Sequence, residues 1–408
     1  MRIALTEKQI TRASIATMLT FFLSGLSVAS FLARIPTIRS ELALEPSRMG
    51  LLLLIGSLGS LIALPSSGPV VGRWGPRVTI WGAYAVWATG ITGVILAYEA
   101  RAAGLLAPAL AFAQIGIAMA NATMNVEGGY VEVVAHRVRM PWYHAAYSVG
   151  TVVAALIGAA CSYFHIGVAQ HLAAVVVCVL LGIVWAGLNY VPQPIIEDLA
   201  GTSTRGNKRT SRAWREKRTL LIGVFVLGTG LMEGAANDWL PLAMVDGFHV
   251  SDTLGTATLA LFLTVLTFTR FASSTLLHRW PVERLVPTLL LIAIGGLIVQ
   301  AVAPWPALAL VGVVAWAIGA ALGFPSAASA LSKEPAMAAA RLSVLSTIGY
   351  GAFLAGPPLI GFLAEHLGYR GALGFIAIPV AVSVMLSAQL KDPQEEDPNE
   401  GTVGNKPH

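Results

Sequence analysis

Long apolar runs recur along the whole sequence, and twelve of them can each cross a lipid bilayer as a helix. An α-helix rises about 1.5 Å per residue, so about 20 apolar residues span a hydrocarbon core of roughly 30 Å. The runs are too long for the strands of a membrane barrel. We therefore predict an all-α membrane protein with twelve transmembrane helices, at residues 13–34, 49–69, 78–98, 105–126, 142–164, 168–190, 219–241, 254–277, 285–303, 307–330, 342–364 and 371–389.

The composition supports this class and argues against others. Only 12% of the residues are charged and 56% are hydrophobic, whereas a soluble domain carries about 25% charged residues. Soluble enzymes, disulfide-rich secreted proteins, disordered proteins and nucleic-acid binders are therefore disfavoured. Cys161 and Cys178 both lie in apolar runs, and no HExxH, GxSxG, GxxxxGK[ST] or CxxC motif occurs. We expect no metal site, no cofactor and no enzymatic activity.

Positive charge is distributed unevenly between the predicted loops. Most of the 26 lysine and arginine residues fall in alternate loops, which the positive-inside rule places in the cytoplasm. Both termini are therefore predicted to be cytoplasmic. The most basic segment, residues 205–218, lies in one of these loops. We interpret it as a linker attracted to anionic lipid headgroups rather than as a nucleic-acid site.

Two short sequence matches indicate an internal repeat. Arg73-Trp74 follows the second predicted span and Arg279-Trp280 follows the eighth, while Leu-Ile-Gly occurs in both the fifth and the eleventh. Tandem six-helix halves around a central site are one plan on which secondary transporters are built. We predict an N-terminal half at residues 1–190, a cytoplasmic linker at 191–218, a C-terminal half at 219–390 and a disordered tail at 391–408.

The loop after the second span, GPVVGRWGPR at residues 68–77, resembles the best-known motif of the major facilitator superfamily. Gly68, Gly72, Arg73, Gly75 and Arg77 match that motif, although Gly72 replaces its usual acidic residue. The resemblance implies the major facilitator fold, transport by alternating access, and a monomer in the bacterial cytoplasmic membrane. It assigns gating to Gly72, Arg73 and Arg77.

Several stretches are more specifically similar to a bacterial subgroup of uncharacterised facilitators, itself distantly similar to fucose permeases. These stretches are ARIPTIRSEL, MNVEGG, MPWYHAAYSVG and EGAANDW, at residues 33–42, 124–129, 140–150 and 233–239. Symporters similar to fucose permeases carry an acidic residue in the fourth helix. In this sequence Asn121 is where we look for it, and asparagine cannot carry the proton.

Ionisable residues inside the spans are candidates for proton coupling, because charge in a bilayer is costly and is retained for function. Glu233 lies roughly 20 Å along the seventh span, past the midplane of the bilayer. Asp238 is rotated by about 140° from Glu233 around the helix and is either functional or a solvated helix end. His144, at the start of the fifth span, is either a proton relay or a satisfied histidine in an interfacial aromatic belt.

Polar side chains at helical spacing are candidates for substrate binding. Asn121 and Asn125 are one turn apart in the fourth span, and Asn237 follows Glu233 by one turn. Tyr147 and Ser148 add hydroxyl groups near the start of the fifth span. Amides and hydroxyls bind hydroxyl-bearing solutes, and they equally form hydrogen bonds between neighbouring helices.

Four further charged residues lie at or near the ends of predicted spans or within them. Glu127 and Glu132 are read as solvated loop charges, unless the fourth helix continues and carries Glu127 into the cavity. Arg270, in the eighth span, is expected to extend to the membrane surface or to pair with a loop carboxylate. Arg34, at the outer end of the first span, is interpreted as a gate or boundary residue.

These observations predict a secondary active transporter that binds protons and a small-molecule substrate in the lipid bilayer. Proton-coupled uptake of a small polar solute, such as a sugar or a related metabolite, fits the amide pairs and the resemblance best. Proton-driven efflux of hydrophobic or cationic compounds is the alternative, since ten tryptophans suit an apolar cavity. A membrane sensor or enzyme that kept the transporter architecture is a third hypothesis.

Overall fold

The computed structural model describes residues 5–137, 139–192, 212–332 and 335–391, and the regular elements in these ranges are all helical. Much of the predicted linker and nearly all of the predicted tail lie outside the described residues. The helices are α1 (Glu7–Leu32), α2 (Ile35–Glu41), α3 (Pro46–Glu99), α4 (Ala103–Ala135), α5 (Met140–Tyr163), α6 (Val168–Leu188), α9 (Lys217–Phe248), α10 (Asp252–Arg279), α11 (Val282–Val302), α12 (Pro306–Ala320), α13 (Gly323–Ser332), α14 (Pro335–Phe375), α15 (Ala377–Leu386) and the short 3₁₀ helix η1 (Ser387–Leu390).

Eleven helical segments within the described ranges are long and apolar enough to cross a membrane. The last of them, Ala340–Leu390, is 51 residues long and contains the two final predicted spans. Within this segment the helix is interrupted at Gly368, whose φ of 71° is non-helical. Gly75 interrupts α3 in the same way, with a φ of 72°, between the second and third predicted spans. Glycine is required at both breaks because a side chain is strained at positive φ. The predicted all-helical, multi-span class is confirmed.

Several helices depart from their predicted limits. α4 continues to Ala135 and α9 to Phe248, so both include polar residues that the hydropathy pattern assigned to loops or helix ends. The short helix α2 was not predicted and begins with Pro36 in its first turn, where proline is tolerated. The tenth predicted span is two helices, α12 and α13, interrupted at residues 321–322.

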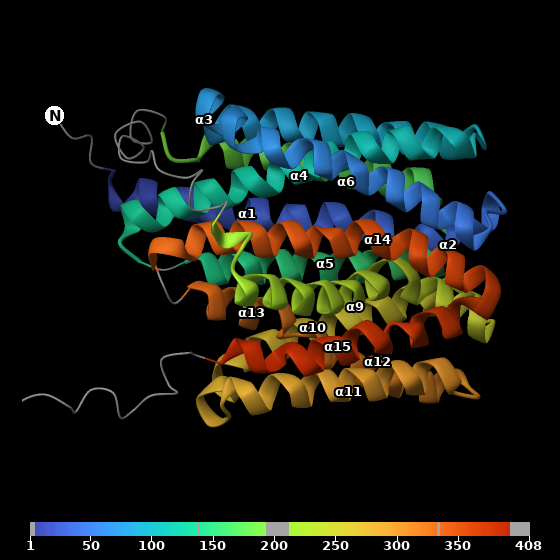
Figure 1. Cartoon of the computed structure of the whole chain (residues 1–408). Helices are drawn as coiled ribbons and strands as arrows, with labels where there is room; N and C mark the ends of the chain where they lie inside the picture. Colours follow the sequence, from blue (N-terminus) through green and yellow to red (C-terminus); the bar gives the residue numbers. More distant parts are fainter. Residues whose placement is uncertain (1–4, 138, 193–211, 333–334, 392–408) are drawn as a thin grey trace, which may run out of the picture.

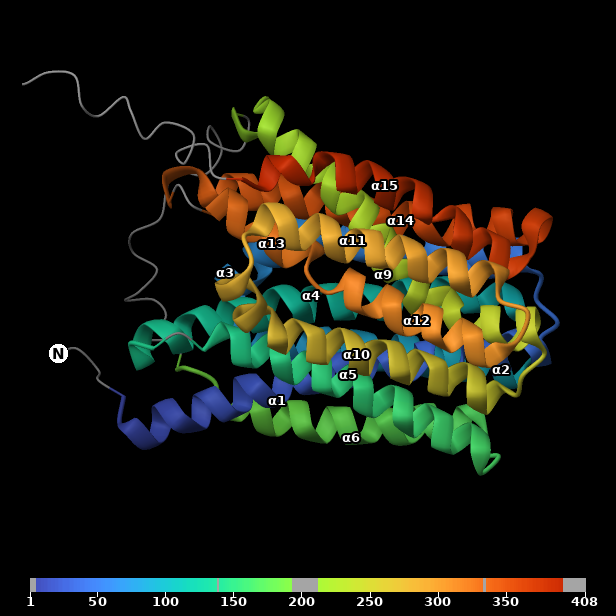
Figure 2. The ribbon, with the colours of Figure 1, turned by 90° about the horizontal axis from the view of Figure 1, so that it is seen from below.

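The helices run side by side along one direction, as Figures 1 and 2 show. In both views the start of α1, the start of α9 and η1 lie at the same end of the bundle. We call this the linker end, because α6 ends and α9 begins there. The turn between α1 and α3, which contains α2, lies at the opposite end, named the α2 end.

Small residues let the helices of the bundle pack closely. A Cβ on Gly25 of α1 would lie 2.1 Å from the carbonyl oxygen of Tyr147 in α5, and one on Gly150 would lie 2.1 Å from that of Phe22. The backbones of α1 and α5 therefore touch at two points, as small-residue contacts between membrane helices allow. This contact fixes the position of Tyr147 and the polar start of α5.

Candidate functional site

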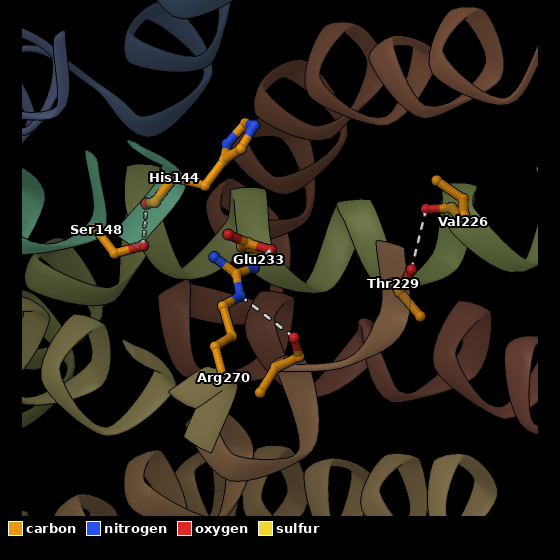
Figure 3. Close-up of polar contacts among 7 residues, drawn as sticks. His144, Ser148, Val226, Thr229, Glu233 and Arg270 are labelled. Carbon is orange, nitrogen blue, oxygen red and sulfur yellow. Dashed lines mark hydrogen bonds and ion pairs between the residues drawn. The ribbon is translucent and has the colours of Figure 1, made fainter. Parts of the chain in front are cut away.

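An ion pair lies between α9 and α10, in the interior of the bundle. Nη2 of Arg270 is 2.7 Å from Oε2 of Glu233. Nε of Arg270 also donates a hydrogen bond of 3.2 Å to the carbonyl oxygen of Ala321. Figure 3 shows the guanidinium reaching from α10 to the carboxylate on α9. The arginine thus joins three segments of the chain, and we call Glu233 and Arg270 the central ion pair.

The break between α12 and α13 supplies the carbonyl that holds Arg270. Ala321 lies in this break, where a carbonyl lacks the partner that a continuous helix would provide. The break packs tightly on α9, since a Cβ on Gly323 would lie 2.6 Å from Cβ of Thr229, one turn before Glu233. A larger residue at position 323 would push the carbonyl away from Arg270.

The central ion pair is accessible rather than sealed. The side chains of Arg270 and Glu233 retain 32% and 25% of their exposure. The expectation that Arg270 extends to the surface or pairs with a loop carboxylate is wrong, because its partner is in a transmembrane helix. The two residues are 37 positions apart. Charge compensation is the sequence signal that could have identified this pair, because an arginine within one transmembrane span needs a carboxylate from another.

The polar start of α5 lies beside the central ion pair. His144 and Tyr147 are both within electrostatic range of Arg270, and Tyr147 is also within range of Glu233. The ring of His144 contacts Phe21 edge to face, with centroids 5.1 Å apart, and the residue is exposed. Ser148 donates a hydrogen bond of 3.2 Å to the carbonyl of His144, visible in Figure 3. The structure therefore brings three predicted residues to one place: His144, Tyr147 and Glu233.

The predicted amide pair in α4 has partners within the protein. The side-chain carbonyl of Asn121 accepts a hydrogen bond of 3.1 Å from Ser24 of α1. Asn125 donates a hydrogen bond of 2.7 Å to the backbone carbonyl of Asn121. Both asparagines are partly exposed, as is Asn237 on α9. Asn121 therefore links α1 to α4 through its side chain.

Asp238 borders a separate cavity of about 80 Å³. The other lining residues come from α1, α3 and α4 and include Ser27, Ser57, Trp87 and Gln114. The reading of Asp238 as a solvated helix end is wrong, because α9 continues for ten residues beyond it, to Phe248. The carboxylate of Asp238 thus faces helices that precede the linker in sequence.

Glu127 is fully buried, so its interpretation as a solvated loop charge is wrong. Its Oε1 accepts a hydrogen bond of 2.7 Å from the backbone N–H of Val191, just after α6. Glu132 also has a structural role, since its Oε1 accepts hydrogen bonds from the backbone N–H groups of Arg139 and Met140 at the start of α5. That helix is therefore capped by a carboxylate from α4.

A profile of the Major Facilitator Superfamily matches residues 17–350. The chain belongs to that superfamily. An uncharacterised MFS-type transporter of Yersinia pestis is 26% identical over 379 residues, which cover 92% of this chain and 94% of that protein. The structure of the nucleoside transporter NupG aligns with a TM-score of 0.74 at 13% identity, covering 94% of this chain and all of that one. The E. coli fucose:proton symporter aligns with a TM-score of 0.60 at 15% identity, over 93% and 98% of the two chains.

These likenesses confirm the predicted family and its resemblance to fucose permeases. The superfamily match also identifies a multi-pass membrane transporter. The relatives do not assign a substrate, so the chemistry of this facilitator has to be argued from its own residues.

The residues assigned to gating by the superfamily motif differ in their contacts. Gly72 and Arg73 are exposed, and a Cβ on Gly72 would meet open space. Arg77 donates hydrogen bonds to the carbonyls of Gly187 and Leu188, at 2.8 and 3.2 Å. A cation at the C-terminus of α6 is favourable because the last carbonyls carry partial negative charge. Arg77 therefore links the break at Gly75 to the C-terminal end of α6 by hydrogen bonds.

Arg34 is buried at the α2 end. Its two terminal nitrogens donate to Oγ of Ser162, at 2.9 Å, and to the carbonyl of Ile166, at 2.8 Å. These contacts connect the junction of α1 and α2 with the last turn of α5 and the loop after it. Arg34 thus sets the position of α2, whichever part it plays in gating.

Sequence reasoning missed a set of contacts at the α2 end. Arg39 forms an ion pair of 2.5 Å with Asp246 of α9, and Thr37 donates a hydrogen bond of 2.9 Å to Asp252 of α10. Thr256 of α10 donates one of 3.0 Å to the carbonyl of Ala33. We call these three interactions the α2-end contact. It joins segments that precede the linker to segments that follow it.

Proposed function

We propose that this facilitator carries a small polar solute across the bacterial cytoplasmic membrane by proton-coupled alternating access. The observation that carries the proposal is the central ion pair, an accessible carboxylate and guanidinium within the transmembrane bundle. The structures similar to this chain include a nucleoside transporter and a fucose:proton symporter, which supports a polar solute and a proton. The proposal includes two six-helix halves, one on each side of the linker, and places both termini in the cytoplasm.

The central ion pair provides a direct coupling between a proton and a solute. A proton that binds Glu233 converts the carboxylate to the neutral acid and removes the charge that holds Nη2 of Arg270. The guanidinium then turns its donors to oxygen atoms of the solute, while Nε stays on the carbonyl of Ala321. Release of the proton restores the ion pair and displaces the solute. Tyr147 and His144, beside the pair, would complete the polar surface of the site.

The distribution of contacts supports an inward-facing state. The α2-end contact closes that end of the bundle, whereas the central ion pair keeps part of its exposure. The positive-inside rule assigns the linker end to the cytoplasm. Transport would then require the α2-end contact to open while the linker end closes, as two halves rock around the central site.

A thermal-shift screen of the purified protein tests the proposal. The panel contains sugars, polyols, amino acids and lipophilic cations, each at acidic and near-neutral pH. We expect a neutral hydroxyl-rich compound to stabilise the protein more strongly at acidic pH. Glu233→Gln should remove this pH dependence, while the exposed Glu99→Gln should keep it. Stabilisation by lipophilic cations alone would instead support efflux.

A further inference from the structure

The cavity that borders Asp238 is lined by one ionisable side chain among the described residues. Within the part of the chain that the structure describes, its lining contains this carboxylate and no lysine, arginine or histidine. The other two carboxylates of α9 form ion pairs, Glu233 with Arg270 at 2.7 Å and Asp246 with Arg39 at 2.5 Å, so Asp238 is in a different situation. A carboxylate removed from bulk water is retained only when it is paired, protonated or bound to a cation.

The cavity also offers oxygen acceptors, beside the N–H donors of Trp87 and of the Gln114 amide. The hydroxyl of Ser27 donates to the carbonyl of Leu23 at 2.7 Å, and that of Ser57 donates to the carbonyl of Leu53 at 2.9 Å. Because both hydrogens are engaged within their own helices, these hydroxyls offer lone pairs to the cavity. Gln114 adds an amide oxygen. A proton on Asp238 would satisfy one of these acceptors, whereas a cation satisfies several at once.

The size of the cavity selects an ion rather than a metabolite. Its volume of about 80 Å³ is far below the roughly 300–1,000 Å³ of pockets that hold small organic ligands. It is enough for an ion and a few water molecules, each of which needs about 30 Å³ in the liquid. The four oxygen-bearing side chains come from α1, α3, α4 and α9, so an ion there would contact helices on both sides of the linker.

We propose that this cavity binds Na⁺. Hard cations take oxygen ligands, and the cavity offers carboxylate, amide and hydroxyl oxygens, with water completing the shell. Asp238 supplies the charge, while Ser27, Ser57 and Gln114 supply neutral oxygens. The ion site is distinct from the central ion pair, which uses Arg270 as its cation. A role of this Na⁺ in transport rests on the proposed function, whereas the binding of Na⁺ to the cavity does not depend on it.

Thermal unfolding of the purified full chain in NaCl, KCl and choline chloride of equal ionic strength tests the proposal. We expect a saturable rise of Tm in NaCl of about 2–4 °C, which is absent in the other salts. Asp238→Asn, nearly the same size and shape, should abolish the rise, and Ser57→Ala should shift its midpoint to higher concentration. Glu233→Gln should retain it, because that residue lies outside the cavity.

A second measurement does not depend on any variant folding. Radioactive sodium bound to the wild-type protein should be displaced by unlabelled NaCl and not by KCl or choline chloride. The proposal is overturned if no sodium binds, if the three salts give the same Tm, or if Asp238→Asn keeps the full rise. A pH-dependent Tm that ignores sodium would assign Asp238 a proton instead. Loss of pH-dependent solute binding with an intact sodium response would contradict only the function proposed for Glu233.

Discussion

Neutralising Asp246 should open the α2 end of the bundle. The side chains of Arg39 and Asp246 keep 21% and 28% of their exposure, so solvent screens their attraction in part. At an effective dielectric of about 20, charges about 4 Å apart attract by about 4 kcal/mol. Desolvation and side-chain ordering offset most of this, which leaves roughly 1–2 kcal/mol. Asp246→Asn should therefore shift the equilibrium toward the open state by about 5- to 30-fold.

The accessibility of position 256 reports this opening. Thr256 is fully buried in the α2-end contact, and cysteine there becomes reactive only when the contact separates. The two native cysteines, Cys161 and Cys178, are first replaced by alanine. We expect the rate of maleimide labelling at Thr256→Cys in detergent to rise about 5- to 30-fold with Asp246→Asn.

Two further variants make this result specific. Arg48→Gln removes an exposed arginine near the same end and should leave the labelling rate unchanged. Exchanging the charges, with Arg39→Asp and Asp246→Arg together, should return the rate toward that of the parent. Equal labelling in the parent and in Asp246→Asn would refute the argument that this ion pair holds the α2 end closed.

Three further predictions concern stability. Arg341 lowers the pKa of Glu216 below the ordinary glutamate value of 4.5. The pair therefore stabilises the fold by up to about 1 kcal/mol at pH values above 4.5, and this stabilisation is lost as the pH falls below that value. Glu216→Gln should flatten the dependence of Tm on pH through that range. Gly75→Ala should destabilise the fold by roughly 1–3 kcal/mol, because a φ of 72° with a ψ of 163° is open almost only to glycine. Gly72→Ala should instead raise Tm slightly, and equal effects of the two substitutions would contradict the break at Gly75. Glu127→Leu should cost about 1–3 kcal/mol in denaturant unfolding, because the N–H of Val191 loses its buried acceptor; an unchanged midpoint would show that water replaces the carboxylate.

The transmembrane helices could be predicted from the sequence because the bilayer imposes one length and one composition on every span. Their ends were harder to place. α4 continues through Gly128 and Gly129 to Ala135, although these glycines and the charges around them are typical of a loop. Glu127 was misread for this reason, since its burial depends on Val191 and the end of α6 rather than on its own neighbours in sequence.

The candidate site could be predicted only in part. Glu233 was identifiable as a carboxylate within an apolar span, and that signal is local. Its partner Arg270 and the carbonyl of Ala321 depend on how α10 and the α12–α13 break pack against α9. No local pattern encodes such a packing. The ion pair between Arg39 and Asp246 could not be predicted either, because charged residues outside the predicted spans are usually solvated.

The central claim is that Glu233 couples a proton to the movement of a solute. The most direct measurement is proton uptake in proteoliposomes that carry an internal pH indicator, with the solute identified by the thermal-shift screen. The account predicts that adding this solute outside the vesicles acidifies the lumen for the wild type and for Glu99→Gln. Glu233→Gln should still exchange solute in counterflow but should move no protons. Solute-driven proton uptake of wild-type size in Glu233→Gln would contradict the account.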